Sequence, residues 1–378
     1  MEQPVLPHDP QQPNPDNPEL HYVSTQEKTM VQHKIARMAF VSLAFLLIFS
    51  IAAGLYWFAR NKTILEQAGQ QSSVSKVTMV TPVPGQGSAT APGEFMINMH
   101  ALPVGDGKIS TTPKVGYIFS CQKTFAGGGA QGSSPWIDGN TWDAGEKVNI
   151  DGSVAWSNAQ FSLSVAGNSR IISGNGLPVD STTGIFPIRS DDPAYQYDRN
   201  PNQITEHTIS LTLPKDPQLG TPSCLGGGMI GIALNGVPIF DGLDAEGRDA
   251  VAHEVQDSCN GHPDKDGVYH YHGPSSCIPG ANKPDTLIGY ALDGFGIYSD
   301  IDESGNEIKN SDLDACHGTT SPIVWDGKKV TMYHYVLTQE YPYTLGCFKG
   351  SNVFHVSQMP RQGSGQPGPN GFPPPPRQ

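Results

Sequence analysis

The sequence predicts a mainly β fold, and three observations support this prediction. The chain has 378 residues, of which 43 are Gly and 33 are Pro, while only 16% are charged. Short runs of β-branched and aromatic residues, such as 161–167 and 207–214, alternate with turn-forming residues. Helical periodicity is scarce outside one apolar run. We therefore expect short strands joined by many turns, arranged as an exported, β-sandwich-like domain.

One long apolar segment precedes this β region. Residues 38–59 carry no charge, and about 20 apolar residues are enough to cross a bilayer as a helix. Tyr56 and Trp57 lie near the end of the run, where aromatic rings anchor to the membrane interface. The alternative is a cleaved signal ending near residues 50–52, but the 37 residues before the run are too many for an ordinary signal. We expect one uncleaved transmembrane anchor.

The positions of the cysteines predict the orientation of this anchor. All six follow the apolar run and none precedes it; they are Cys121, Cys224, Cys259, Cys277, Cys316 and Cys347. An even number of cysteines confined to one side is typical of disulfides in an oxidising compartment. We expect a single-pass protein of the cell (inner) membrane, with a cytoplasmic N-terminus and a main domain that is periplasmic or extracellular.

Composition divides the rest of the chain. Residues 1–37 are polar and proline-rich, which predicts a disordered cytoplasmic segment, and 60–93 are typical of a flexible stalk. The β domain is expected over 94–356, and 357–378 form a Pro/Gly-rich tail that is also expected to be disordered. The formal net charge of −13 argues against a nucleic-acid partner. The membrane is the one partner that the sequence indicates.

Two segments of the β domain resemble each other, at about 231–277 and 289–347. Their shared landmarks, in order, are Asn235-Gly236 and Asp293-Gly294, Asp257-x-Cys259 and Asp314-x-Cys316, Tyr269-His-Tyr271 and Tyr333-His-Tyr335, and finally Cys277 and Cys347. We infer an internal duplication in which each copy begins with a type I′ hairpin. The simplest disulfides are then Cys259–Cys277, Cys316–Cys347 and Cys121–Cys224, although six cysteines allow fifteen pairings.

Histidines supply the candidate site. Side chains two apart on a β-strand share a face, so His270 and His272 lie together, with Tyr269 and Tyr271 on the other face.

The second copy keeps only part of this pattern. His270 corresponds to His334, whereas Val336 replaces His272 and Thr319 replaces His262. We expect His262, His270 and His272 to form the site, with His334 brought close if the two copies pair about a pseudo-twofold axis. The tyrosines are expected to pack in the core.

Imidazole is a ligand for Zn and Cu, and three histidines leave an open coordination position. The sequence therefore predicts a Cu or Zn site. The alternative is that these histidines line a polar crevice or pack without metal.

These motifs resemble the YHYH-domain family of bacterial exported and membrane-anchored proteins. The matching stretches are Asn175–Pro178, Asn200–Asn202, Gly231–Pro238, Cys259–His262, Tyr269–His272 and Gly289–Phe295, which cover roughly residues 150–350 in order. Gly296 departs from the proline that usually follows Gly-Phe in this family. The resemblance implies one continuous domain over 94–356 and a functional role for the His-rich motif, but it implies no reaction.

Three functions remain open at this point. The first is a membrane-anchored domain that binds Cu or Zn through the histidines. The second is a metal-dependent periplasmic enzyme, either a hydrolase or an oxidoreductase. The third is a structural or interaction module of the cell envelope without metal. No phosphate-binding glycine loop, nucleophile elbow or zinc-helix motif is present, so the sequence predicts no catalytic residue and, by default, no enzyme.

Overall fold

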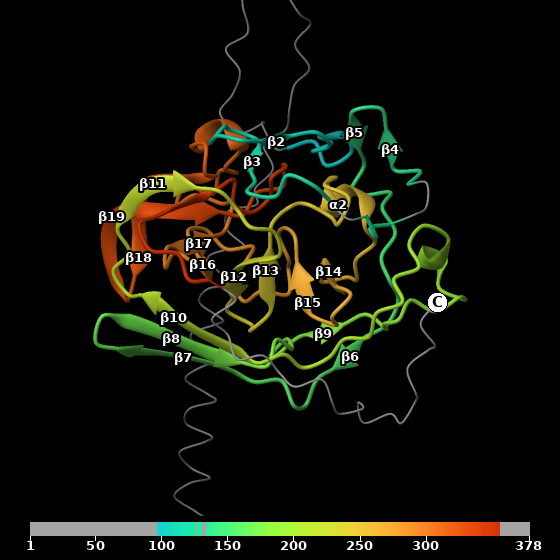
Figure 1. Cartoon of the computed structure of the whole chain (residues 1–378), viewed down its shortest axis with the longest axis horizontal. Helices are drawn as coiled ribbons and strands as arrows, with labels where there is room; N and C mark the ends of the chain where they lie inside the picture. The colour runs from blue at the N-terminus through green and yellow to red at the C-terminus, as the bar shows by residue number, and fades with distance from the viewer. Residues whose placement is uncertain (1–96, 126, 131–133, 356–378) are drawn as a thin grey trace, which may run out of the picture. The chain divides into compact units, whose positions relative to one another are not determined.

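The computed structural model describes residues 97–125, 127–130 and 134–355 (Figure 1). They belong to one compact unit, 90–378, of the two into which the chain divides. The expected cytoplasmic segment (1–37), anchor (38–59), stalk (60–93) and tail (357–378) lie outside the described residues. In the part of the chain that is described, no helix has the length and apolar character needed to span a membrane.

Short strands dominate the described residues, which confirms the mainly β prediction. The strands that precede the large sheet are β1 (Leu102–Pro103), β2 (Ile109–Ser110), β3 (Ile118–Phe119), β4 (Ile137–Asp138), β5 (Thr141–Trp142), β6 (Val154–Ala155), β7 (Phe161–Ala166), β8 (Ser169–Gly174), β9 (Thr182–Thr183), β10 (Ile209–Pro214) and β11 (Leu219–Ser223). The later strands are β12 (Met229–Ala233), β13 (Pro238–Phe240), β14 (Gly261–Pro263), β15 (Tyr269–Tyr271), β16 (Leu287–Ala291), β17 (Gly296–Tyr298), β18 (Gly318–Trp325), β19 (Lys328–Val336) and β20 (Phe348–Gly350). The helical segments are η1 (Pro193–Gln196), α2 (Ala250–His253) and η2 (Asn310–Asp312).

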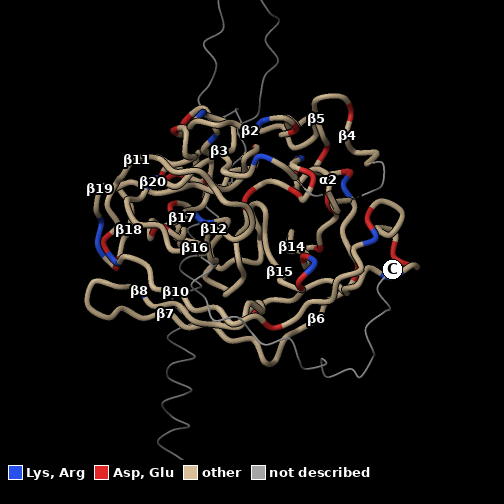
Figure 2. The backbone as a smooth tube through the Cα atoms, in the orientation of Figure 1, with Lys and Arg blue, Asp and Glu red and all other residues tan. Residues whose placement is uncertain are grey.

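An eight-stranded mixed sheet forms the centre of the domain, in the order β14-β15-β13-β12-β16-β17-β19-β18. Its middle strands β12, β16 and β17 contain no charged residue (Figure 2). Such continuous apolar runs are typical of strands that are buried on both faces. The core of the domain therefore lies around these strands, and the charged residues lie nearer its rim.

The sheet has the same sequence of pairings in both directions from its centre. On one side β12–β13 are antiparallel, β13–β15 parallel and β15–β14 antiparallel. On the other side β16–β17, β17–β19 and β19–β18 repeat these orientations. The registers agree as well, because His262 lies opposite His270 and Thr319 lies opposite His334. The duplication itself stays a prediction, with which this arrangement is consistent.

The two hairpins have different turns from those expected. Gly236 and Gly294 have positive φ, but neither Asn235 nor Asp293 does. A type I′ turn needs positive φ at both central residues, so the prediction of type I′ turns is wrong. Instead Asn235 Oδ1 accepts a hydrogen bond from the backbone N–H two residues on, as does Asp293 Oδ1. The acidic or amide side chain stabilises the turn locally, and glycine alone supplies the left-handed backbone.

A close approach of backbone to tyrosine recurs in both halves of the sheet. A Cβ atom added to Gly261 would lie 2.3 Å from the Tyr269 ring, and one added to Gly318 would lie 2.3 Å from the Tyr333 hydroxyl. Only glycine leaves room for the ring at these positions. The Tyr269 hydroxyl donates to Asp257, 2.8 Å away, and thereby ties the start of β14 to β15. His262 is the residue of β14 that follows Gly261, so this packing helps to position it.

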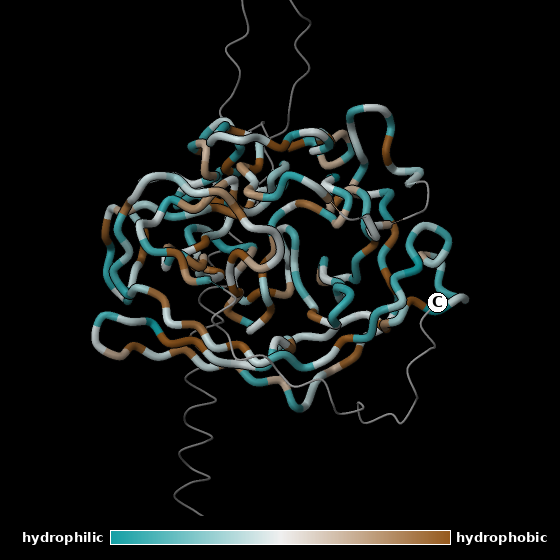
Figure 3. Tube along the Cα trace, viewed as in Figure 1, coloured by the Kyte–Doolittle hydropathy of each residue, from teal (hydrophilic) through white to brown (hydrophobic). Residues whose placement is uncertain are grey.

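The remaining strands form five smaller sheets in the described residues: β1-β5-β4, β10-β8-β7, β11-β20, β2-β3 and β6-β9. Along β10 buried and exposed residues alternate, with apolar side chains on the buried face (Figure 3). Beside it on β8, the guanidinium of Arg170 is buried and contacts the rings of both Tyr290 and Trp325. This grouping of strands differs from the two sheets of the expected β-sandwich.

Three disulfides join the chain as the sequence predicted. They are Cys121–Cys224, Cys259–Cys277 and Cys316–Cys347. The second bond ties the segment before β14 to the segment after β15, and the third makes the corresponding connection between the segments before β18 and after β19. No described cysteine is free. The second and third disulfides therefore each constrain one edge of the large sheet, and the second lies at the edge that has His262 and His270.

Candidate metal centre

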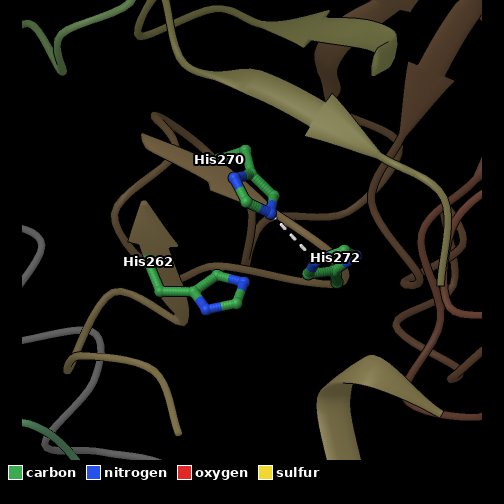
Figure 4. Close-up of side chains that lie close together, drawn as sticks. All are labelled: His262, His270 and His272. Carbon is green, nitrogen blue, oxygen red and sulfur yellow. Dashed lines mark hydrogen bonds between the residues drawn. The ribbon is translucent and has the colours of Figure 1, made fainter. Parts of the chain in front are cut away.

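Three histidines from the edge of the large sheet converge on one point (Figure 4). His262 lies on β14 opposite His270 of the neighbouring β15, and His272 directly follows β15. One ligand atom from each residue lies within 4.8 Å of those of the other two. The prediction that these three histidines lie together is therefore confirmed. Side-chain alternation brings His270 and His272 to one face, and the antiparallel pairing adds His262.

Backbone carbonyls determine which nitrogens face the centre. Nδ1 of His270 lies 2.8 Å from the carbonyl oxygen of Val268, and Nδ1 of His272 contacts the carbonyl oxygen of Asp241. A carbonyl can only accept, so we assign the ring proton to Nδ1 in both histidines. In neutral rings both Nε2 atoms then carry lone pairs, and these atoms lie 2.9 Å apart. Two lone pairs at this distance repel each other unless a cation lies between them.

His262 differs from its two neighbours because its ring has no hydrogen-bond partner. Both of its nitrogens are buried, and neither makes a hydrogen bond within the described part of the chain. Its ring centroid is 4.6 Å from that of His270. Phe240 stacks on the His270 ring, with the centroids 3.9 Å apart. A buried polar atom without a partner costs about 1–3 kcal/mol and calls for an explanation, such as a bound water or ion.

Burial keeps the three rings neutral. Each of them is at most 4% exposed. Burial lowers the pKa of His270 to about 4 and, together with the nearby His270, that of His272 to about 3. Burial and the two neighbouring histidines also lower the pKa of His262 well below its usual value. The neutral imidazole is the form that binds metals, so the group is ready to act as ligands at neutral pH.

A carboxylate approaches the histidines from the end of a short helix. Glu254 is the C-cap residue of α2, whose N-cap, Asp249, accepts a hydrogen bond from Ala252 N. Its Oε2 lies 3.4 Å from Nε2 of His262 and 3.5 Å from Nε2 of His272. Oε2 is buried and makes no hydrogen bond to any described residue. Burial raises the pKa of Glu254 well above its usual value, and the nearby Asp244 raises it further.

Sequence patterns did not predict Glu254. His253-Glu254 would belong to a zinc-helix motif only with a second histidine four residues after the first, and Asp257 stands at that position. No local pattern relates Glu254 to His262 or His272, because α2 reaches them only through the folded chain. The one usable signal was a carboxylate within ten residues of the histidine cluster, which is common in any acidic chain.

A cleft of about 530 Å³ leads to the histidines. Its lining includes all three of them together with Phe240, Asp241, Asp244 and Glu254, and it extends to the loop residues 198–202. Burial raises the pKa of Asp241 to about 7. Asp244 instead forms an ion pair with Arg248, whose nearest nitrogen lies 2.7 Å away. The cleft gives a small molecule or ion a path towards the three histidines, past a lining that combines carboxylates with Arg199 and Lys265.

His334 does not join the group, so the expectation that strand pairing brings it close is wrong. It lies on β19, and β13, β12, β16 and β17 separate that strand from β15. Five strand steps of about 4.8 Å place the two histidine strands roughly 24 Å apart. Around His334 the ring of Tyr298 makes an edge contact, with centroids 5.0 Å apart. The order of strands in the sheet separates the two histidines instead of joining them.

His253, a weaker candidate because it lies outside the His-rich motif, also points elsewhere. Its Nε2 lies 2.9 Å from a carboxylate oxygen of Asp106. The tyrosines take the structural role that was expected of them: Tyr269 donates to Asp257, and Tyr271 accepts a hydrogen bond from Asn235, 2.9 Å away. Both are buried, with ring centroids 5.8 Å apart.

Together these features define a mainly β, disulfide-bonded domain with a buried group of three histidines. Residues 210–311 match the model of the family described as YHYH protein. The chain is a YHYH-domain protein, and the matched region contains all three histidines and Glu254. Searches of curated proteins and of solved structures found no match to this chain.

Proposed function

We propose that the domain binds one transition-metal ion, Zn²⁺ or copper, through His262, His270 and His272. The observation that carries this proposal is the position of the two Nε2 atoms, which face each other 2.9 Å apart while both Nδ1 atoms contact backbone carbonyls. Metal-binding histidines characteristically donate their other ring N–H to a carbonyl or carboxylate, which fixes the ring and raises its basicity.

The separation of two of the ligand atoms suits one ion after a small adjustment. Two ligand atoms bound to a tetrahedral Zn²⁺ lie about 3.3 Å apart, given metal–nitrogen distances of about 2.0–2.1 Å. The separation of 2.9 Å between the Nε2 atoms of His270 and His272 is slightly shorter than this value. Moving the two atoms apart by a few tenths of an ångström brings them to the tetrahedral value.

The purely structural alternative explains these residues less well. His317 is also buried, but its Nε2 has a hydrogen-bonding partner in Thr338 Oγ1, 2.9 Å away. His334 likewise has a carbonyl partner and lies against Tyr298. His262, in contrast, has no such partner within the described residues. Histidines that serve only packing are satisfied in this fold, which favours a ligand role for His262.

The experiment uses the full chain, purified in detergent, and matched histidine variants. We expect the wild type to bind one equivalent of Zn²⁺ or Cu²⁺ in a competition titration with a chromophoric chelator. His270→Ala/His272→Ala removes two ligands and is expected to weaken binding by at least about 100-fold. His334→Ala removes the histidine at the equivalent strand position and is expected to leave binding unchanged. No stoichiometric metal in the wild type, or equal losses in both variants, contradicts the proposal.

We also propose that this domain is held outside the cytoplasm by the apolar segment 38–59, as a single-pass membrane protein. Three disulfides support an oxidising compartment. The repeated pairing pattern of the sheet further supports an ancestral duplication in which only the first copy, 231–277, has the metal-binding histidines.

A further inference from the structure

The three histidines bind a metal in the function proposed above, but that function assigns no role to the carboxylate of Glu254 beside them. Its Oε2 lies at 3.4 and 3.5 Å from the Nε2 atoms of His262 and His272. These separations match the distance of about 3.3 Å between two ligands of one tetrahedral ion. Oε2 is turned away from solvent and has no donor in the described part of the chain.

Other carboxylates near the cleft are already engaged. Asp244 pairs with Arg248 and accepts hydrogen bonds from two backbone N–H groups. Asp198 accepts hydrogen bonds from Val255 N and Asn200 N. Asp241 accepts one from Leu243 N. Glu254 is thus the carboxylate with a free, buried oxygen that reaches the histidines.

Charge gives a second, independent reason. Three neutral imidazoles contribute no charge, so a buried divalent ion held by them alone would be uncompensated, which is costly in a low-dielectric site. A buried glutamate oxygen without a donor is costly as well, because it has lost its contacts with water and gained no partner. An ion bound between Glu254 and the histidines removes both costs.

We propose that Glu254 is the fourth ligand of the metal centre and that it selects a divalent ion, Zn²⁺, against Cu⁺. This inference rests on the metal-binding function proposed above. Carboxylate oxygen is a hard, anionic donor that suits divalent ions, whereas Cu⁺ prefers soft donors and gains little from it. The three histidines give affinity for either metal, and the glutamate gives the preference between them.

The test uses Co²⁺ as a spectroscopic substitute for Zn²⁺ in the full chain. The wild type should give the intense visible absorption of a four-coordinate site, and Glu254→Gln should shift or weaken these bands. The same variant should bind Zn²⁺ at least about 10-fold more weakly, while its affinity for Cu⁺ changes by less than about 3-fold. Glu246→Gln is the matched control, because Glu246 is partly exposed and pairs with Arg248.

The outcomes separate this inference from the function on which it rests. An unchanged Co²⁺ spectrum and Zn²⁺ affinity in Glu254→Gln would overturn the ligand role, while loss of metal in His270→Ala/His272→Ala would leave the metal site standing. A wild type that binds neither Co²⁺ nor Zn²⁺ would overturn both. If Glu254→Gln fails to fold, as judged by near-ultraviolet circular dichroism, Glu254→Asp tests the same point. It keeps the charge but shortens the reach, and should still weaken Zn²⁺ binding.

Discussion

At the scale of single residues, His270 and His334 make the same contact with the backbone but have different neighbours. His270 and His334 each place Nδ1 against the carbonyl oxygen two residues before, at 2.8 and 3.2 Å. Beside His270 lie two further imidazoles, whereas His334 faces Tyr298. The strand position fixes the orientation of the ring, and the neighbours decide whether its free nitrogen can bind a metal.

The paired tyrosines allow a prediction about stability. Tyr269 donates to Asp257, which is fully buried, whereas Tyr333 donates to Asp314, whose side chain is 35% exposed. Tyr269→Phe is expected to lower the free energy of unfolding by about 1–3 kcal/mol, because the buried carboxylate loses a donor that water cannot replace. Tyr333→Phe should cost less than half of that. Urea unfolding of the metal-free chain measures both, and equal losses would contradict this account.

The buried His317 predicts a pH dependence. Burial lowers its pKa from about 6.5 to about 3. Between these two pH values the unfolded chain binds a proton at this ring and the folded chain does not. Its contribution to stability is complete above pH 6.5 and is lost as the pH falls towards 3. His317→Asn should reduce the slope of unfolding free energy against pH by up to about 1.4 kcal/mol per unit. Asparagine suits the backbone, because His317 has φ +69° and Asn260 occupies the equivalent position at +59°.

The measurement for His317 is urea unfolding of wild type and variant between pH 6.5 and 4.5, with a chelator present. The chelator is needed because protons compete with metal at the other histidines. The difference between the two slopes isolates the contribution of His317. Parallel curves for the two proteins would show that this ring is protonated equally in both states.

Residue patterns predicted the three histidines of the site, because these residues lie close together in the sequence. Period-two alternation placed His270 beside His272, and the comparison with the second segment, in which Thr319 replaces His262, added His262. Glu254 could not be predicted in this way, since its approach depends on where α2 packs. His334 was misplaced for a related reason: sequence similarity between the halves does not reveal how many strands separate them.

At the scale of elements, two three-residue strands hold the histidines, and strands this short need support. β14 and β15 pair with each other, and β15 also pairs with β13. The disulfide Cys259–Cys277 joins their flanks across 18 residues. A short, covalently closed edge positions the three rings with little contribution from the helices.

This closure gives a prediction for paired cysteine variants. Cys259→Ser/Cys277→Ser opens an 18-residue loop and should cost about 3 kcal/mol of stability. Cys121→Ser/Cys224→Ser opens a 103-residue loop and should cost as much or more, about 4–5 kcal/mol. Only the first variant should weaken Zn²⁺ binding under conditions in which both remain folded. Unfolding curves and Zn²⁺ titrations together test this; equal affinities in the two variants would contradict it.

The hairpins and the YHY strands were predictable from local signals, whereas the large sheet was not. Asn235-Gly236 and Asp293-Gly294 mark turns by their composition, although only the glycines take positive φ. The parallel pairings of β13 with β15 and of β17 with β19 join strands that are distant in sequence. Parallel neighbours require a long crossover, and nothing in the strand residues themselves specifies the partner.

At the scale of the whole molecule, the expected arrangement is an anchored, acidic domain. The net charge of −13 over the whole chain raises the local concentration of cations and favours solubility. Three disulfides and a buried histidine group suit a domain that meets metal ions outside the reducing cytoplasm. The anchor lies outside the described residues and remains a proposal.

Fractionation tests the anchor. The full chain should remain with the membrane after alkaline carbonate extraction, and a variant lacking residues 38–59 should not. Protease added outside spheroplasts should cleave the stalk, 60–93, and release a disulfide-bonded domain. Protection of the domain from external protease would contradict the expected orientation.

The most direct test of the central claim is X-ray absorption at the zinc edge of the full chain loaded with one equivalent of Zn²⁺. The account predicts three imidazole nitrogens and one carboxylate oxygen, all at about 2.0–2.2 Å from the metal. His270→Ala/His272→Ala should lose this signal, and His334→Ala should keep it. A first shell of oxygen atoms without the outer scattering of imidazole rings would contradict the assignment of this centre.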